Sequence, residues 1–185
     1  MATNKSNSFH LFEQEKEHAN PMVASLTEHL INIRKKNIAA SLSDFEGSAH
    51  KLENVKQLRG VTFIDDSRST NLNSVWFALN SMTKPTVWIT NIDHVENITE
   101  DLVQAVREKV KSIVIQGVYN TEVYEYFSSL NNNIQVEMTL EDAVSSAFYS
   151  CKPGDVVLFS PGVTGNASQT YRERGDKFQE AVAQL

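Results

Sequence analysis

The chain has 185 residues, of which 41% are hydrophobic, so it can bury one core of domain size. Its formal net charge is -6 with no basic run, which argues against a nucleic-acid partner, because phosphate backbones are bound mainly by clustered Lys and Arg. The single cysteine, Cys151, excludes an internal disulfide; it falls on an apolar helical face, which favours a buried structural thiol and suits a reducing cytoplasm. We see neither an apolar leader nor an apolar run of membrane-spanning length, and therefore expect no export and no membrane partner.

Residues 1–44 are predicted to be a helical lead. The first 20 or so are polar with few apolar anchors, and Pro21 then suits the first turn of a helix. Apolar residues follow at spacings of three and four, which predicts a helix with one apolar stripe: Val23, Leu26, Leu30 and Ile33. A second short helix is expected around 37–45. The domain proper is expected to cover 45–185.

From residue 51 the chain alternates between short β-rich segments and longer helical ones. Strands are predicted at 51–55, 61–64, 86–90, 112–116, 134–138 and 156–160, the first two joined as a hairpin through Leu58-Arg59-Gly60. Helices are predicted at 72–82, 99–110, 121–130, 139–151 and 168–183. Strands separated by helices require right-handed crossovers. The fold class is therefore α/β: a Rossmann-like three-layer domain with a mostly parallel sheet of about six strands and one antiparallel edge strand, preceded by short helices.

The loop after the second predicted strand is the most informative one. Phe63–Asn71 reads FIDDSRSTN, in which an apolar strand runs into a polar loop that opens a helix. In an open α/β sheet ligands bind at this edge, because helix N-termini and unpaired backbone N–H groups converge there. The alternative is purely local: Asp65, Asp66, Ser67 and Ser69 close a turn and Thr70 caps the helix.

Parallel strands gather their following loops at one edge, so 65–70, 91–97, 117–120 and 161–167 are expected to lie close together. Ser160–Asn166 contains two glycines that let backbone approach a ligand, and the hydroxyls of Ser160 and Thr164. Arg172 and Arg174 fall in the first turns of the last helix, where the helix dipole disfavours cations. One of them is a candidate for binding, and a solvated salt-bridged face is the alternative.

Other chemistries find little support. Asp65, Asp66, Asp93 and His94 offer oxygen and nitrogen ligands from two neighbouring loops, but their spacing matches no known metal cage, so no metal site is assigned. No Cys/His spacing indicates zinc, and no nucleophile elbow is present. The glycines nowhere form G-x-x-x-x-G-K-[ST], so this sequence has no P-loop, and no catalytic residue is assigned.

Three segments, in order, resemble the carboxy-terminal third of the Mur ligases, and most closely the branch that adds D-glutamate to UDP-N-acetylmuramoyl-alanine. Phe63–Asn71 resembles that family's [FY]-x-N-D-S-K-A-T-N, and Phe45–Glu53 resembles its F-x-G-x-x-H-R-x-E. Phe159-Ser160-Pro161, followed by Tyr171–Phe178, resembles its L-S-P-A and F-x-x-R-G-[DN]-x-F ending. The helix predicted after Pro21 resembles the tail of the family's central domain only weakly.

The resemblance implies a domain that closes over a central ATPase domain and presents an amino acid to an acyl-phosphate. It implies nucleotide-binding roles for Lys51 and Asp66. It implies substrate-binding roles near the amino-acid carboxylates for a further set: Arg68, Thr70, Asn71, Ser160 and Tyr171.

The chain departs from the family pattern in its binding loops. Thr90–His94 stands where the family has Gly-Gly-x-x-Lys, so that lysine contact is missing. Asp65 replaces an asparagine and Arg68 a lysine, and the loop after Pro161 lacks the family's A-C-A-S segment. The substrate is therefore left open.

The leading hypothesis is a stand-alone Mur-ligase carboxy-terminal-type domain that is incomplete as a catalyst and acts with a separate ATPase-bearing Mur ligase fragment, or is retained for binding. Its expected ligand is an amino acid or small dicarboxylate. No cofactor is expected on this chain alone, while ATP and magnesium are implied by the family. The alternative is a non-catalytic binding or regulatory module that uses the same sheet edge for a small anion, or its amino-terminal helices for a protein. A Rossmann oxidoreductase would need a G-x-G-x-x-G after the first strand, and none is present.

Overall fold

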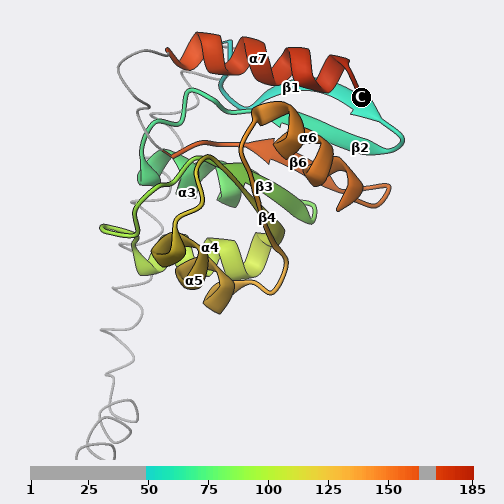
Figure 1. Cartoon of the computed structure of the whole chain (residues 1–185). Coiled ribbons are helices and arrows are strands. Elements are labelled where there is room, and N and C mark those ends of the chain that lie inside the picture. The colour runs from blue at the N-terminus through green and yellow to red at the C-terminus, as the bar shows by residue number, and fades with distance from the viewer. Residues whose placement is uncertain (1–48, 163–169) are drawn as a thin grey trace, which may run out of the picture. The chain divides into compact units, whose positions relative to one another are not determined.

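The computed structural model describes residues 49–162 and 170–185 (Figure 1). The predicted helices between 21 and 45, and the expected domain boundary after residue 44, lie outside these residues. Within the described part the chain alternates strands and helices: β1 (Glu53–Leu58), β2 (Val61–Asp65), α3 (Leu72–Ser81), β3 (Thr86–Thr90), α4 (Glu100–Lys109), β4 (Val110–Gln116), α5 (Thr121–Leu130), β5 (Ile134–Glu137), α6 (Leu140–Tyr149), β6 (Val156–Phe159) and α7 (Tyr171–Ala183).

The described strands form one six-stranded sheet in the order β1-β2-β6-β3-β4-β5. β1 pairs antiparallel with β2 at the edge, and the other neighbours are parallel. The hairpin turn at Arg59 and Gly60 has φ values of 48° and 81°, a left-handed pair that suits a tight turn between twisted strands. The predicted fold class is therefore confirmed for the sheet and its helices.

Helices cover both faces of the sheet, giving three layers (Figure 1). One core lies between the sheet and α3, α4 and α5, and the other lies between the sheet and α6 and α7. β6 supplies both, since Val156 and Leu158 enter the first core while Val157 and Phe159 enter the second. Each such fully buried side chain contributes on the order of 2 kcal/mol. A strand buried on both faces reads as a continuous apolar run, as VVLF does here.

Several boundaries differ from the prediction for local reasons. β1 starts at Glu53 and not at 51, because His50 and Leu52 have positive φ values of 63° and 47°, so the chain turns there. The cap of α3 is Asn71 and not Thr70: the Asn71 side chain accepts a hydrogen bond from the Ser74 N–H at 2.9 Å.

The last two helices are also shorter than predicted. α6 ends at Tyr149, so Cys151 follows the helix and is half-buried against the second core. α7 begins at Tyr171, where Thr170 and Glu173 form a reciprocal capping box. None of the helices in the described part of the chain has the length and apolar character needed to cross a membrane.

Candidate functional site

The loops at the carboxyl ends of the parallel strands are joined by hydrogen bonds. The Gly162 N–H donates to the Ser69 carbonyl at 3.0 Å, and the Asn91 N–H donates to the Pro161 carbonyl at 3.0 Å. Asn120 Nδ2 then donates to the Asp93 carbonyl at 3.0 Å. The predicted gathering of these loops at one edge is confirmed, apart from 163–167, which lie outside the described residues.

The sheet changes direction of winding around β6. β2 and β3 flank this strand and continue into α3 and α4 on one face, whereas β6 continues into α7 on the other face. Loops that leave neighbouring strands toward opposite faces open a crevice at the carboxyl end, which is where α/β domains bind ligands. Asp66 and Ser160 directly follow β2 and β6 and therefore lie at this point.

Asp66 is the centre of a fully buried polar cluster. Lys51 Nζ lies 3.0 Å from Asp66 Oδ1, which also accepts the Leu52 N–H at 3.3 Å. Oδ2 accepts the hydroxyls of Ser160, at 2.8 Å, and of Ser69. Burial raises the pKa of the Asp66 carboxyl, and the Lys51 ammonium beside it opposes that rise. The two residues implied as nucleotide ligands are thus brought together, with both Asp66 oxygens already accepting donors.

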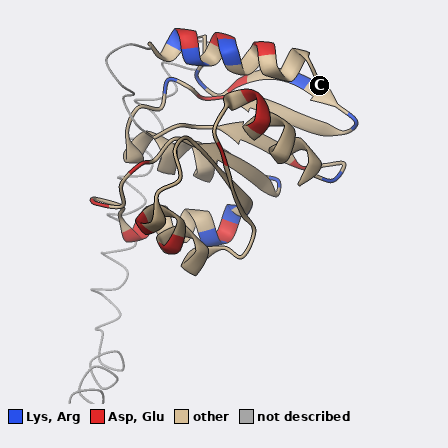
Figure 2. Cartoon of the chain, viewed as in Figure 1, with Lys and Arg blue, Asp and Glu red and all other residues tan. Residues whose placement is uncertain are grey.

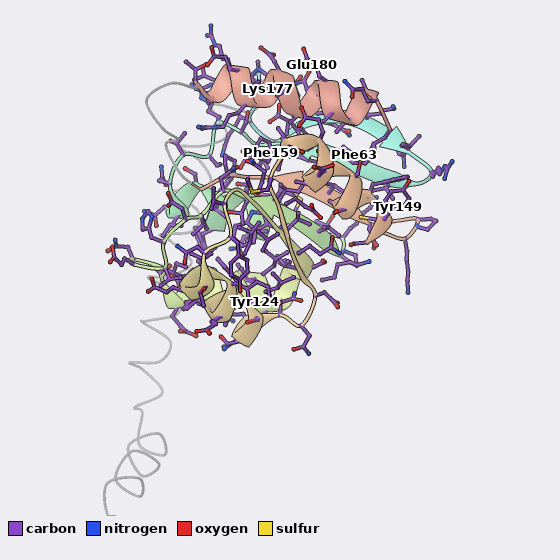
Figure 3. All side chains as sticks on the ribbon, in the orientation of Figure 1. Phe63, Tyr124, Tyr149, Phe159, Lys177 and Glu180 are labelled. Atoms are coloured by element: carbon purple, nitrogen blue, oxygen red, sulfur yellow. The ribbon has the colours of Figure 1, made fainter. Side chains whose placement is uncertain are left out.

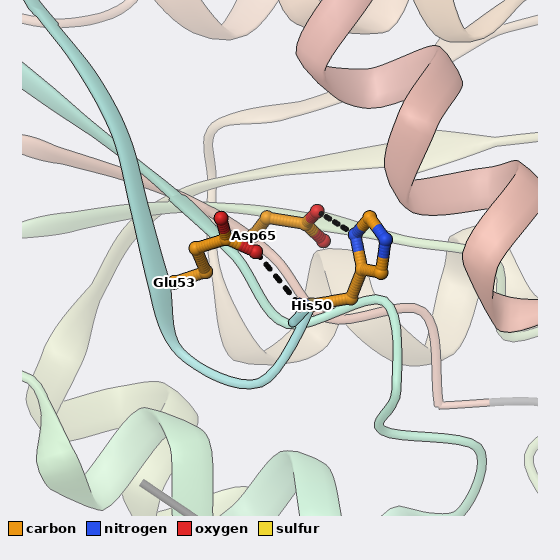
Figure 4. Close-up of side chains that lie close together, drawn as sticks. All are labelled: His50, Glu53 and Asp65. Carbon is orange, nitrogen blue, oxygen red and sulfur yellow. Dashed lines mark hydrogen bonds and ion pairs between the residues drawn. The ribbon is translucent and has the colours of Figure 1, made fainter. Parts of the chain in front are cut away.

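A second cluster beside it ties the Lys51 turn to helix α7 (Figure 4). His50 Nδ1 lies 2.8 Å from Asp65 Oδ2, and the His50 N–H donates to Glu53 Oε2 at 2.8 Å. From α7, Gln179 Nε2 donates to Asp65 Oδ2 at 3.3 Å, and Asp176 Oδ1 lies 3.6 Å from His50 Nε2. These contacts fix the left-handed turn at residues 50–52 and with it the place of the Lys51 ammonium.

The metal-ligand set considered from the sequence does not come together. Asp93 and His94 are exposed and pair with each other at 2.5 Å. Within residues 49–162 and 170–185, the ligand atoms that lie within 4.8 Å of one another belong instead to His50, Glu53 and Asp65. Their described hydrogen bonds account for this grouping without an ion.

Arg68 and Tyr171, two of the residues implied in substrate binding, pack against each other. The Arg68 guanidinium carbon lies 5.4 Å from the centre of the Tyr171 ring, a cation–π distance. The His50 ring meets the same tyrosine edge-on at 6.4 Å, and the Arg68 N–H donates to the His50 carbonyl at 3.1 Å. Both residues are half-buried.

The other substrate-binding candidates are placed differently. Thr70, two residues after Arg68, is half-buried, while Asn71 is exposed and its side-chain oxygen caps α3. Ser160 is 0% exposed and its hydroxyl is directed at Asp66. Ser160 therefore contacts the buried carboxylate in this structure, and a role at the substrate remains a prediction for it and for the others.

The two arginines of α7 separate into an outer and an inner one. Arg172 is exposed, and its Nε donates to the Tyr171 hydroxyl at 3.3 Å. Arg174 is 6% exposed, and its Nη2 donates to the Ser67 carbonyl at 3.4 Å. Burial lowers the pKa of the Arg174 guanidinium. Of the two, Arg172 is the one that contacts Tyr171.

Helix α7 can pack closely against His50 and Ser67 because residue 175 is glycine. A Cβ at Gly175 would lie 2.6 Å from Ser67 Oγ and closer still to His50 Nδ1. The sequence indicated neither this contact nor the part played by His50. Both join segments far apart in the chain, which helical or strand periodicity does not report.

Sequence similarity to two named ligases agrees with the motifs. The UDP-N-acetylmuramoylalanine–D-glutamate ligase of Bacteroides fragilis is 37% identical over 168 residues, which cover 90% of this chain and 38% of that protein. The protein of the same name from Christiangramia forsetii is 37% identical over 167 residues, again covering 90% and 38%. The solved UDP-N-acetylmuramate–alanine ligase of Thermotoga maritima covers 73% of this chain and 30% of its own, at 14% identity and a TM-score of 0.49.

No protein-family model matches the chain. It spans about 38% of the length of the curated relatives. The sequence similarity extends over most of the chain, and the described fold is the Rossmann-like domain that the motifs implied. The chain belongs to the Mur ligase family and has the form of its carboxy-terminal domain.

Proposed function

We propose that this domain holds the incoming amino acid, of the D-glutamate type, for an amide-forming reaction in peptidoglycan-precursor synthesis, and that a separate ATPase-bearing protein completes the catalyst. The observation that carries the proposal is the Arg68 guanidinium held over the Tyr171 ring at the carboxyl edge of the sheet. The similar B. fragilis protein is named for ligation of D-glutamate, which supports a dicarboxylate as the ligand.

Arg68 is the group best suited to a carboxylate. Its planar guanidinium can donate two parallel hydrogen bonds. Because the guanidinium already packs on an aromatic ring, it loses less conformational freedom when it binds a ligand. Thr70, two residues further and half-buried, has a hydroxyl that can donate to a second carboxylate oxygen. Such groups orient the amine of the amino acid toward an electrophile, and orientation is most of what a ligase must supply once the acyl group is activated.

The nucleotide roles proposed for Lys51 and Asp66 depend on the partner. Asp66 is 0% exposed and its oxygens accept from Lys51, Leu52, Ser69 and Ser160, so it has no exposed acceptor for a free nucleotide. ATP with magnesium, bound on the partner, would supply the activation of the acyl group. This chain's residues would bind and orient the amino acid in the cytoplasm, where both substrates are available.

The proposal is tested by following backbone amide NMR signals of the full chain during titration with D-glutamate. Signals of the 65–72 loop and of the start of α7 are expected to shift, and Arg68→Ala is expected to weaken binding about tenfold or more, because a charge-assisted pair is lost. Arg107→Ala is the matched control, since Arg107 is an exposed arginine on α4. Equal weakening by both variants, or equal shifts with an unrelated small anion such as sulfate, would contradict an amino-acid site and favour a general anion-binding module.

A further inference from the structure

The part of the carboxyl edge formed by β4 and β5 exposes large apolar side chains. Over the described residues, five large apolar side chains are exposed, and three of them belong to the loops that follow these two strands: Val118, Tyr119 and Met138, at 79%, 55% and 66%. We call these three residues the apolar ledge. Exposed apolar groups gathered in one place mark interaction surfaces more often than scattered ones do.

The apolar ledge is one surface. The Gly117 N–H donates to the Glu137 carbonyl at 2.8 Å, and Gln116 Nε2 donates to the Met138 carbonyl at 3.1 Å. The Tyr119 ring also packs against Tyr124 of α5, with ring centres 5.5 Å apart. The two loops are thus fastened to each other and to the domain, so a partner would meet a surface that is already ordered.

Charge divides the sheet edge into two halves. Segments 91–101, 117–122 and 137–142 contain no Lys or Arg, and their acidic residues are Asp93, Glu96, Glu100, Asp101, Glu122, Glu137, Glu141 and Asp142, the last four of them in the two segments that carry the apolar ledge. Several lie in first helical turns, where the dipole favours them, and Figure 2 shows red segments at the starts of α4, α5 and α6. The crevice half carries both signs, with Lys51, Arg68 and Arg172 near Asp65 and Asp66. Nucleotides and nucleic acids are repelled by the acidic half, which leaves a protein with basic residues as the fitting occupant.

We propose that the apolar ledge is the docking surface for the ATPase-bearing Mur-type partner, through an apolar patch bordered by Lys and Arg on that protein. The inference rests on the proposed function, which requires such a partner. It is supported by continuity with the crevice: the Asn91 N–H donates to the Pro161 carbonyl, and Asn91 Nδ2 donates to the Gln116 carbonyl at 3.0 Å, so one loop joins the two halves.

The test is site-specific photo-crosslinking of the full chain in the cells that produce it, with the photoreactive residue p-benzoylphenylalanine in place of Tyr119. The control carries the same residue in place of Tyr149, which is 83% exposed at the end of α6. Figure 3 shows Tyr149 well away from Tyr124, the neighbour of the ledge. We expect an adduct at position 119 and not at 149, with a protein that contains the G-x-x-x-x-G-K-[ST] motif of a Mur-type ATPase.

The captured protein is then purified and titrated with the full chain. Met138→Ser is expected to weaken its binding about tenfold or more, as central apolar contacts do, and Tyr149→Ser to leave it unchanged. Equal adducts at both positions, no adduct at 119, an adduct with a second copy of the chain, or unchanged binding by Met138→Ser would overturn the proposal. D-glutamate binding by Met138→Ser alone is measured in parallel. Absence of D-glutamate binding by both the wild type and Met138→Ser would refute the amino-acid site, and it would leave the docking result unaffected.

Discussion

Replacing Lys51 with methionine removes the one cation that faces the buried Asp66 carboxylate in the described structure. The side chains of Lys51 and Asp66 are 6% and 0% exposed, and Nζ and Oδ1 lie 3.0 Å apart. Methionine keeps most of the alkyl volume beside Phe77, whose ring centre is 5.8 Å from the ammonium. Its effect on the free energy of unfolding therefore reports the loss of charge more than the loss of packing.

The expected loss at pH 7 is about 3 kcal/mol, because breaking a buried ion pair on one side leaves an uncompensated charge. That loss corresponds to a fall in Tm of roughly 10 °C for a domain of this size. Asp66→Asn alone is expected to destabilise as well, because it leaves the Lys51 ammonium buried. The double variant is expected to lose less than the sum of the two, which a double-mutant cycle detects.

The loss of stability caused by Lys51→Met is expected to change with pH in one direction. Burial already raises the pKa of Asp66 above its ordinary 3.8, and removal of Lys51 raises it further. For an acid whose pKa is raised in the folded state, the stability it contributes is fully present below the unfolded value and is lost as pH rises through the folded value. The penalty of Lys51→Met is therefore expected to be small near pH 4 and to grow toward pH 7.

Urea unfolding of the wild type and Lys51→Met at several pH values measures this penalty, with Lys84→Met as the control for an exposed lysine. A penalty under about 1 kcal/mol at pH 7, or one that does not shrink in acid, would refute the buried ion pair as the centre of this cluster.

Three further outcomes follow from the same structure. Gly175→Ala is expected to destabilise by about 1–3 kcal/mol in urea unfolding because its Cβ would collide with Ser67 and His50, although helix propensity alone favours alanine; a stabilised variant would contradict that packing. Asn71→Ala is expected to lose about 1 kcal/mol as the cap of α3, and Thr70→Ala less, measured by thermal unfolding; the reverse order would restore Thr70 as the cap. Burial raises the pKa of the Cys151 thiol to about 12, so the native chain is expected to react with a disulfide reagent at pH 8 far more slowly than the unfolded chain; equal rates would contradict this.

Much of the fold could be predicted from the sequence because its elements are locally encoded. β3 was predicted at its observed bounds, and the helix predicted at 121–130 is α5. The start of β1 was wrong because His50 and Leu52 adopt left-handed backbone that non-glycine residues seldom take. That conformation is imposed by the distant partners Asp65 and Asp66.

The site was predicted as a set of residues but not as a set of contacts. The sequence placed Asp65 and Asp66 in the same candidate site. In the structure Asp65 contacts His50 and Asp66 contacts Lys51, because Asp65 ends the strand and Asp66 begins the loop. The Ser160 hydroxyl donates to Asp66 across 94 positions of sequence, a contact that the sequence did not indicate, and its role at a substrate stays a prediction. Such pairings arise only when the sheet brings β2 and β6 side by side.

Isothermal titration of the purified full chain, with D-glutamate in one experiment and ATP–magnesium in another, tests most directly whether an amino-acid site is built here without a nucleotide site. We expect saturable heat with D-glutamate that Arg68→Ala abolishes, and no heat with ATP–magnesium. Binding or hydrolysis of ATP by the chain alone, without heat from the amino acid, would contradict this expectation.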